Sequence, residues 1–317
     1  MTSLSSSRLA SLVCLALSIA AASHCTAQSN QTSDLQQRIH GQLAALQEHP
    51  PSSNHELGYQ WTLLGVEYTE ADDFKNAENA YNRALEALSK DPADASLYAE
   101  TLDQFGALYR MYERTPEASN LYRKALALRQ KMSDPIEIAR SQSRLAEIAL
   151  ATHKFKEAFT EADDAYAAMV RLNDPAKVEL ISTLIERSYA QCGLRRHKEC
   201  LSDAKEALAL SRSSFTGDSQ PAGAALVALG SAQLRDGEAE QAGDSTQQGL
   251  RILRERLAEG DPRITFVLLQ YRDCLRAMHR NDEAQEIATQ LSVKNRQPAR
   301  PCPQCTVSAW GLRSPAR

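Results

Sequence analysis

The sequence has few aromatic residues, little net charge and only one long apolar run. Aromatic residues make up 6% of the 317 residues and β-branched runs are scarce, which favours helices over sheet. The formal net charge of −4 gives no indication of a nucleic-acid partner. The chain carries no phosphate-binding glycine loop, zinc-protease motif or nucleophile elbow, and its seven histidines are scattered. We therefore expect an all-α protein that is not an enzyme and needs no metal or other cofactor.

The one long apolar run lies at the N-terminus and has the pattern of a signal peptide. Arg8 precedes the apolar stretch Leu9–Ala22, and Cys25-Thr26-Ala27 offers small residues for cleavage before Gln28. This stretch is too short to cross a bilayer, which takes about 20 residues, and no later stretch is apolar for long enough. We expect residues 1–27 to be removed and the protein to be exported, to the periplasm or outside the cell. A lipoprotein anchored at Cys25 is the alternative.

Two sequence features recur with one period along residues 57–291. Small residues that suit close helix packing recur at intervals of 40 to 42 residues, at Ala77, Ala118, Ala158, Cys200, Ala242 and Ala284. Asp-Pro pairs recur with the same period, at Pro92, Pro135, Pro175 and Pro262. Pro221, which does not follow an aspartate, stands at the boundary between the pairs of Pro175 and Pro262. Because proline interrupts a helix, these residues mark unit boundaries. The spacing predicts about six helix pairs.

The first two units carry the most specific motif. Trp61, Leu64, Gly65 and Tyr68 reproduce the W-x₂-L-G-x₂-Y pattern, followed by Ala77, Tyr81 and Ala84, and unit two repeats it with Phe105, Gly106, Tyr109, Ala118, Tyr122 and Ala125. On these residues the chain resembles tetratricopeptide repeat proteins. The period of about 42 and the string Arg251–Leu257 resemble the kinesin-light-chain variety. The resemblance implies a right-handed superhelical solenoid of antiparallel helix pairs that binds another polypeptide.

Units four and six depart from the pattern. Arg187 and Ser188 stand where leucine and glycine are usual, and the turn from Gly193 to Lys198 is expected to be longer than the others. Arg272 stands at the small-residue site of unit six, which we expect to form a polar cap. The family's groove positions are therefore not assigned in these two units.

The segments on either side of the array differ in composition. Residues 28–56 hold one predicted helix, 34–47, which starts at a capping Asp34 and is expected to cover the first pair. Residues 292–317 carry five basic residues, four prolines and no acidic residue, and we expect them to be disordered. In contrast, residues 28–291 hold all 40 acidic residues but only 30 of the 36 basic ones. An acidic array suits a basic partner.

The resemblance also implies a partner-binding face, because the first helix of each pair lines the concave side. Transferred residue by residue, the groove positions fall on Tyr59, Thr62 and Val66 in unit one, on Glu100, Asp103, Ala107 and Arg110 in unit two, and on Arg140, Ser143 and Glu147 in unit three. The lysine and asparagine with which chaperone-binding members clamp a carboxylate are absent. Solvated helix faces remain the alternative for each of these residues.

Five cysteines follow the signal peptide, an odd number for an exported chain. On the family template Cys192 and Cys200 flank the turn of unit four, where a disulfide is feasible and two buried thiols are the alternative. Cys302 and Cys305 form one CxxC, for which a local disulfide or a chance pair of cysteines is expected. We predict a non-enzymatic scaffold for protein–protein interaction. A thiol-redox protein using Cys302 and Cys305 and a self-associating structural protein of the cell envelope are the alternatives.

Overall fold

The computed structural model describes residues 34–90, 94–172, 176–257 and 261–294, and all regular elements in these ranges are helices. A first helix covers residues 34–48. The others are α2 (Asn54–Glu70), α3 (Phe74–Leu88), α4 (Ala95–Met111), α5 (Thr115–Met132), α6 (Pro135–Ala151), α7 (Phe155–Met169), α8 (Lys177–Gly193), α9 (His197–Ser214), α10 (Gln220–Arg235), α11 (Ala239–Arg256), α12 (Pro262–Ala277) and α13 (Asn281–Lys294). Residues 1–27, Cys302 and Cys305, for which the sequence makes predictions, lie outside the described residues.

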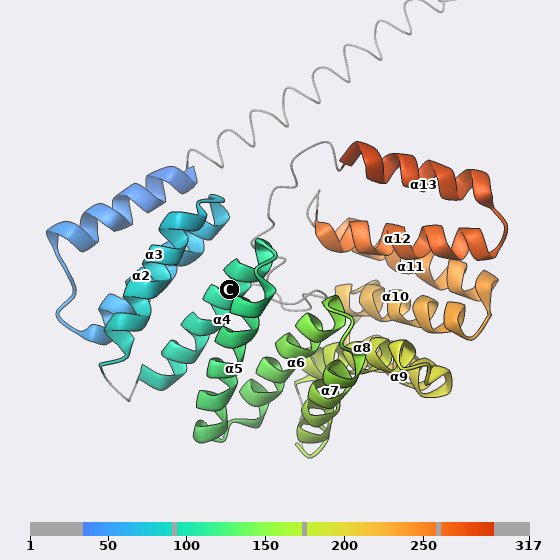
Figure 1. Cartoon of the computed structure of the whole chain (residues 1–317), viewed down its shortest axis with the longest axis horizontal. Coiled ribbons are helices and arrows are strands. Elements are labelled where there is room, and N and C mark those ends of the chain that lie inside the picture. The colour runs from blue at the N-terminus through green and yellow to red at the C-terminus, as the bar shows by residue number, and fades with distance from the viewer. Residues whose placement is uncertain (1–33, 91–93, 173–175, 258–260, 295–317) are drawn as a thin grey trace, which may run out of the picture.

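From α2 onward these helices form antiparallel pairs that follow one another along an open arc (Figure 1). Each second helix packs on the first helix of its own pair and on the first helix of the next pair. First helices of neighbouring pairs also contact each other directly, as α6 does α8 and α8 does α10. Because the first helices approach each other most closely, they line the inner side of the curve. The all-α solenoid expected from the sequence is confirmed.

One turn geometry recurs within all six described pairs. Each pair is joined by three residues, and the middle one has a positive φ between 57° and 89°, at Asp72, Glu113, His153, Arg195, Gly237 and His279. The amide of the next residue donates to the carbonyl five residues earlier, at 2.8 to 2.9 Å. This is the Schellman motif at the C-terminus of a helix. A residue with left-handed backbone conformation turns the chain, so that the amides after the helix donate to its last carbonyl groups.

The turns settle the register that the sequence leaves open in units four and six. In every pair the residue with positive φ stands five positions before the recurring small residue, as Arg195 does before Cys200 and His279 before Ala284. The turn of unit four therefore has the same length as the others, and the prediction of a longer one is wrong. Arg187 and Ser188 depart from the sequence motif, but both lie within the regular helix α8.

Small residues let the two helices of a pair approach. A Cβ atom added to Gly65 would lie 2.6 Å from the ring of Tyr81, and one added to Gly106 would lie 2.6 Å from the ring of Tyr122. In unit four Ser188 takes this place and donates a 2.9 Å hydrogen bond to the carbonyl of Cys200. A serine thus replaces the glycine because its hydroxyl has a buried acceptor.

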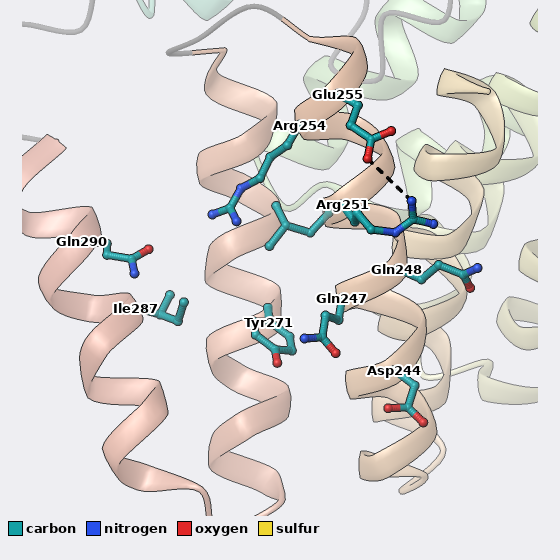
Figure 2. A pocket seen from close by; sticks show the side chains of 10 residues that line it. Asp244, Gln247, Gln248, Arg251, Arg254, Glu255, Tyr271, Ile287 and Gln290 are labelled. Atoms are coloured by element: carbon teal, nitrogen blue, oxygen red, sulfur yellow. Dashed lines mark ion pairs between the residues drawn. The ribbon is translucent and has the colours of Figure 1, made fainter. Parts of the chain in front are cut away.

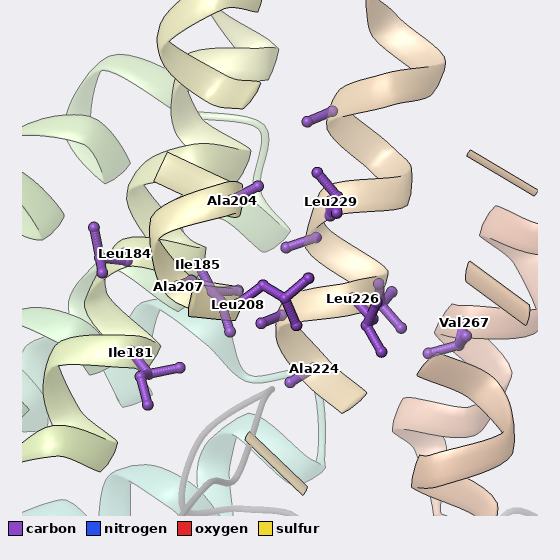
Figure 3. Close-up of a cluster of buried hydrophobic side chains, with 14 of the residues drawn as sticks. Ile181, Leu184, Ile185, Ala204, Ala207, Leu208, Ala224, Leu226, Leu229 and Val267 are labelled. Carbon is purple, nitrogen blue, oxygen red and sulfur yellow. The ribbon is translucent and has the colours of Figure 1, made fainter. Parts of the chain in front are cut away.

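The apolar core is continuous through pairs three to six. Figure 3 shows its centre, to which α8 contributes Ile185, α9 contributes Leu208 and α10 contributes Leu226. A separate cluster holds the first two pairs together around Tyr81 and Phe105. Only a small cluster around Tyr122 and Leu145 connects pair two to pair three. The buried apolar cluster at this junction is therefore smaller than the clusters on either side of it.

The two ends of the described array have different surfaces. Ile39 and Leu46 of the helix at 34–48 pack against Leu64 and Ala80, so this helix lies against the first pair. On α13 the residues Asp282, Gln285, Glu286 and Thr289 are exposed and polar, as expected for a terminal cap. Within the described ranges, no helix combines the length and apolarity that crossing a bilayer requires.

Candidate partner-binding face

The predicted groove residues of unit one lie partly at the surface. Tyr59 is 42% exposed, and Val66 is half-buried. Thr62 is buried, with its hydroxyl 2.9 Å from the carbonyl of Gly58 and 2.9 Å from the hydroxyl of Thr101 on α4. Thr62 therefore joins two first helices, whereas Tyr59 is free to meet another molecule.

In unit two the predicted residue Asp103 is buried, with 2% of its surface exposed. Its carboxylate accepts hydrogen bonds from Arg129 of α5 and Arg144 of α6. Arg129 also donates to Ser141 at 2.6 Å and lies 3.1 Å from Glu137. Burial lowers the pKa of Arg129, and the nearby Glu137 partly opposes this effect. Asp103 therefore serves the junction between pairs two and three and is not accessible to a partner.

The predicted residues of unit three are also engaged within the array. Arg140 donates to Glu179 of α8 at 2.9 and 2.7 Å and to Glu137. Ser143 donates to both carboxylate oxygens of Glu186, at 2.6 and 2.7 Å, and Glu147 is buried. The expectation of an open polar groove in this unit needs correction. The inner faces of α6 and α8 pack closely, so their polar side chains satisfy one another.

The remaining predicted positions of unit two differ in exposure. Glu100 is exposed, Ala107 is buried, and Arg110 is half-buried beside the hydroxyl of Tyr122. Glu100 therefore joins Tyr59 as a predicted residue that stands at the surface of the inner face.

The register of unit six places two further residues on this face, which the sequence alone did not assign. Counting back from Ala284 as Tyr59 and Thr62 count back from Ala77, the equivalent positions are Phe266 and Leu269. Phe266 is 41% exposed and Leu269 is 36% exposed, so this first helix presents two large apolar side chains at the surface. In the sequence, the register of unit six is given by the five positions from the turn residue His279 to the small residue Ala284. This interval can be used only once the turn is known to have the same geometry as the other five.

Phe266 lies against Tyr189, the residue that unit four contributes to the same face. Their ring centroids are 6.0 Å apart in an edge-to-face arrangement, and Gln270 donates a weak 3.4 Å hydrogen bond to the Tyr189 hydroxyl. Burial raises the pKa of that hydroxyl. The array is curved enough here for α8 and α12 to meet across α10. The result is a short apolar patch, Tyr189, Phe266 and Leu269, which we call the inner patch.

The cysteines within the described ranges form one disulfide and one buried free thiol. Cys192 and Cys200 are joined by a disulfide with a Cα–Cα distance of 5.3 Å, and both are buried. Cys274 is a buried free thiol whose pKa is raised by burial, which disfavours a reactive thiolate. Among the residues that the structure describes, no group of three or more histidine, cysteine, aspartate or glutamate side chains could hold a metal ion.

Comparison with known proteins agrees with this architecture. Residues 60–131 match the tetratricopeptide repeat family model. No curated protein sequence matches the chain. Similar solved structures include a Rap protein complexed with competence and sporulation factor, with a TM-score of 0.60 and 12% identity over 83% of this chain and 77% of that one.

Two further solved structures are similar to the array. BtubC (BKLC) from P. vanneervenii has a TM-score of 0.55 and 17% identity, covering 70% of this chain and 91% of that one. A putative kinesin light chain with nearly identical TPR-like repeats from Podosopora anserina has a TM-score of 0.51 and 15% identity, covering 66% of this chain and 100% of that one. Residues 60–131 therefore carry tetratricopeptide repeats, and the array as a whole has the solenoid fold of these similar structures.

Proposed function

We propose that this protein is an exported, non-enzymatic scaffold that binds a segment of another polypeptide on the inner face of its array. The observation that carries the proposal is the inner patch, where Phe266 and Leu269 stay exposed although the array buries most of its large apolar side chains. Exposed apolar residues gathered at one place mark interaction sites more often than scattered ones do. Aromatic side chains contribute a large share of the binding free energy at protein interfaces.

The charge of the array suggests the chemistry of the partner. Residues 28–291 carry 40 acidic and 30 basic side chains. On the inner face, Glu100 is exposed at the position that Tyr59 holds in unit one. The Asp273 side chain, one turn after Leu269, is 49% exposed and also pairs with Arg272 at 2.8 Å. A segment with apolar side chains and basic residues would match these groups, and the charges would speed its encounter with the array. The Rap protein of the same fold, solved with competence and sporulation factor, supports ligand binding by such an array.

The disulfide supports export. Disulfides persist in oxidising compartments and are rare in the reducing cytosol. Cys192 and Cys200 have a Cα–Cα distance of 5.3 Å, inside the usual range of about 4.4 to 6.8 Å, without any change of the regular turn. The other units have alanine at the position of Cys200, so packing alone does not require a cysteine there.

Affinity capture with matched variants tests the binding site. The double change Phe266→Ala and Leu269→Ser should weaken retention of the partner at least about tenfold, because it removes the apolar anchors. Val170, which is 48% exposed at the end of α7, provides the control, and Val170→Ser should leave retention unchanged. Circular dichroism checks that all variants stay helical. Equal retention by the parent and the double variant would place the binding site elsewhere.

Sequencing the N-terminus of the protein from its native host tests export separately. The expected mature chain begins at or near Gln28. An intact Met1 contradicts export by cleavage, and a diacylated Cys25 identifies the lipoprotein alternative.

A further inference from the structure

A second concave surface lies away from the inner face, between α11 and α13. It is a groove of about 790 Å³ whose floor includes Leu250, Tyr271 and Ile287. Figure 2 shows Gln247 and Arg254 extending from α11 toward α12, while Ile287 and Gln290 point from α13 into the same space. Since α11 and α13 are the second helices of their pairs, this groove is separate from the inner patch on the first helices.

The rim of the groove is equipped to bind an extended backbone. Gln247, Gln248 and Gln290 are exposed, and their amides can both donate to and accept from a peptide main chain. Arg254 is exposed and has no ion-pair partner among the residues that the structure describes, so its guanidinium can donate to carbonyl groups. Asp244 and Glu255 on α11 add acidic groups to the lining.

We propose that the groove is the docking site of this chain's own residues 295–317. The groove and this segment meet at one end. Arg254 and Glu255 lie in the last turn of α11, Gln290 lies in the last turns of α13, and α13 ends at Lys294. The last turn of α13, after which the segment begins, therefore lies toward this end of the groove.

The composition of the segment fits the groove. Its four prolines disfavour a helix and favour an extended chain, which the glutamine amides of the rim can bind. Its basic residues, among them Arg300 and Arg313, match Asp244 of the lining and Glu286 on the exposed face of α13, whereas Glu255 of the lining already pairs with Arg251 at 3.6 Å. Trp310 is the large apolar side chain that could cover Tyr271 and Ile287. It follows Lys294 by 16 residues, an extended reach of roughly 50 Å, which is ample for the segment to turn back along α13.

Tryptophan fluorescence of the whole protein tests this assignment, because the chain has only two tryptophans. Trp61→Phe leaves Trp310 as the only reporter. We expect its emission to be shifted to the blue, and its quenching by acrylamide to be weaker, compared with the same protein unfolded in guanidinium. Tyr271→Ala should return both properties toward the unfolded values. The double change Gln247→Ala and Gln290→Ala, at exposed residues that do not support the core, should shift them in the same direction.

Phe266→Ala on the inner face is the matched control and should leave the emission of Trp310 unchanged. Solvent-like emission in the Trp61→Phe protein overturns the proposal. A blue shift that Phe266→Ala removes and the groove variants do not would place the segment on the inner face. A blue shift that grows with protein concentration would assign the groove to a second copy. Partner retention is measured independently, so this test and that of the proposed function can fail separately.

Discussion

Asp103 on α4 and Arg144 on α6 form a buried ion pair between the first helices of two successive repeats. The two residues are 41 positions apart, about one repeat, and Arg129 of α5 binds the same carboxylate oxygen. The ion pair lies at the junction between the apolar cluster of the first two pairs and that of pairs three to six. The relative position of these two parts of the array therefore depends on charge as well as on apolar packing.

Replacing Asp103 should destabilise the protein strongly. Asp103→Ala leaves two guanidinium groups buried without their shared carboxylate, and breaking such a pair costs about 3–5 kcal/mol. Urea unfolding followed by circular dichroism measures the loss. Glu157→Ala is the control, because Glu157 pairs with Arg123 at the surface, and that loss should stay below about 1 kcal/mol. Similar losses in the two variants would contradict the role assigned to Asp103.

Gly65 and Gly41 should respond in opposite directions to alanine. At Gly65 the new Cβ would lie 2.6 Å from the ring of Tyr81, so Gly65→Ala should lower the unfolding free energy by about 1–3 kcal/mol. At Gly41, in the helix at 34–48, a Cβ meets nothing within 4 Å. There alanine should stabilise the protein by about 0.5–1 kcal/mol, because it suits a helix better than glycine does. A tolerated Gly65→Ala would show that the first pair is packed differently.

The left-handed turn residues offer a stabilising change. Glu113 and Arg195 adopt φ values of 57° and 62°, a conformation that favours glycine. Glu113→Gly and Arg195→Gly should each raise the unfolding free energy by about 0.5–1 kcal/mol. Gly237 already occupies the equivalent turn at φ 89°, and Gly237→Ala should be destabilising. Thermal melting of the three variants measures both directions, and a loss of stability in both glycine variants would contradict the shared turn geometry.

Tyr122 should make the stability depend on alkaline pH. Burial raises its pKa to about 12, whereas an unfolded tyrosine ionises near 10. The folded state therefore keeps a proton that the unfolded state releases, so the stabilisation is complete below about pH 10 and is lost as the pH rises toward 12. The shift corresponds to about 2–3 kcal/mol.

Urea unfolding at about pH 8 and about pH 11.5 measures this loss. Tyr122→Phe should reduce the difference between the two conditions without abolishing it, because burial also raises the pKa of Tyr81 and Tyr189. Tyr59→Phe, at an exposed position, should behave as the parent does. An undiminished difference in Tyr122→Phe would show that Tyr122 does not carry the effect.

Much of the architecture follows from the sequence because a solenoid depends on local packing. Each pair contacts mainly its neighbours, so one steric rule repeats along the chain, with a small residue such as Ala77 or Ala118 wherever two helices cross closely. The period of these residues was enough to predict the helix pairs. It was also enough for unit four, where the small residue is Cys200.

The exposure of the inner face could not be predicted in the same way. Tyr59, Asp103 and Ser143 are all groove positions, yet the first is 42% exposed and the other two are 2% and 8% exposed. Whether such a residue meets solvent depends on how closely the next first helix approaches. That distance is set by side chains about 40 residues away, as Asp103 with Arg144 and Ser143 with Glu186 illustrate.

The sequence by itself thus determined the helix pairs, their period and the small residues at their crossings, because these depend on contacts within one repeat. Only the tertiary structure decided which polar residues pair between repeats and which apolar ones stay exposed. It brought Tyr189 of α8 against Phe266 of α12 across an intervening helix. The physical reason is that curvature accumulates from one repeat to the next, so contacts between distant repeats are a property of the whole array.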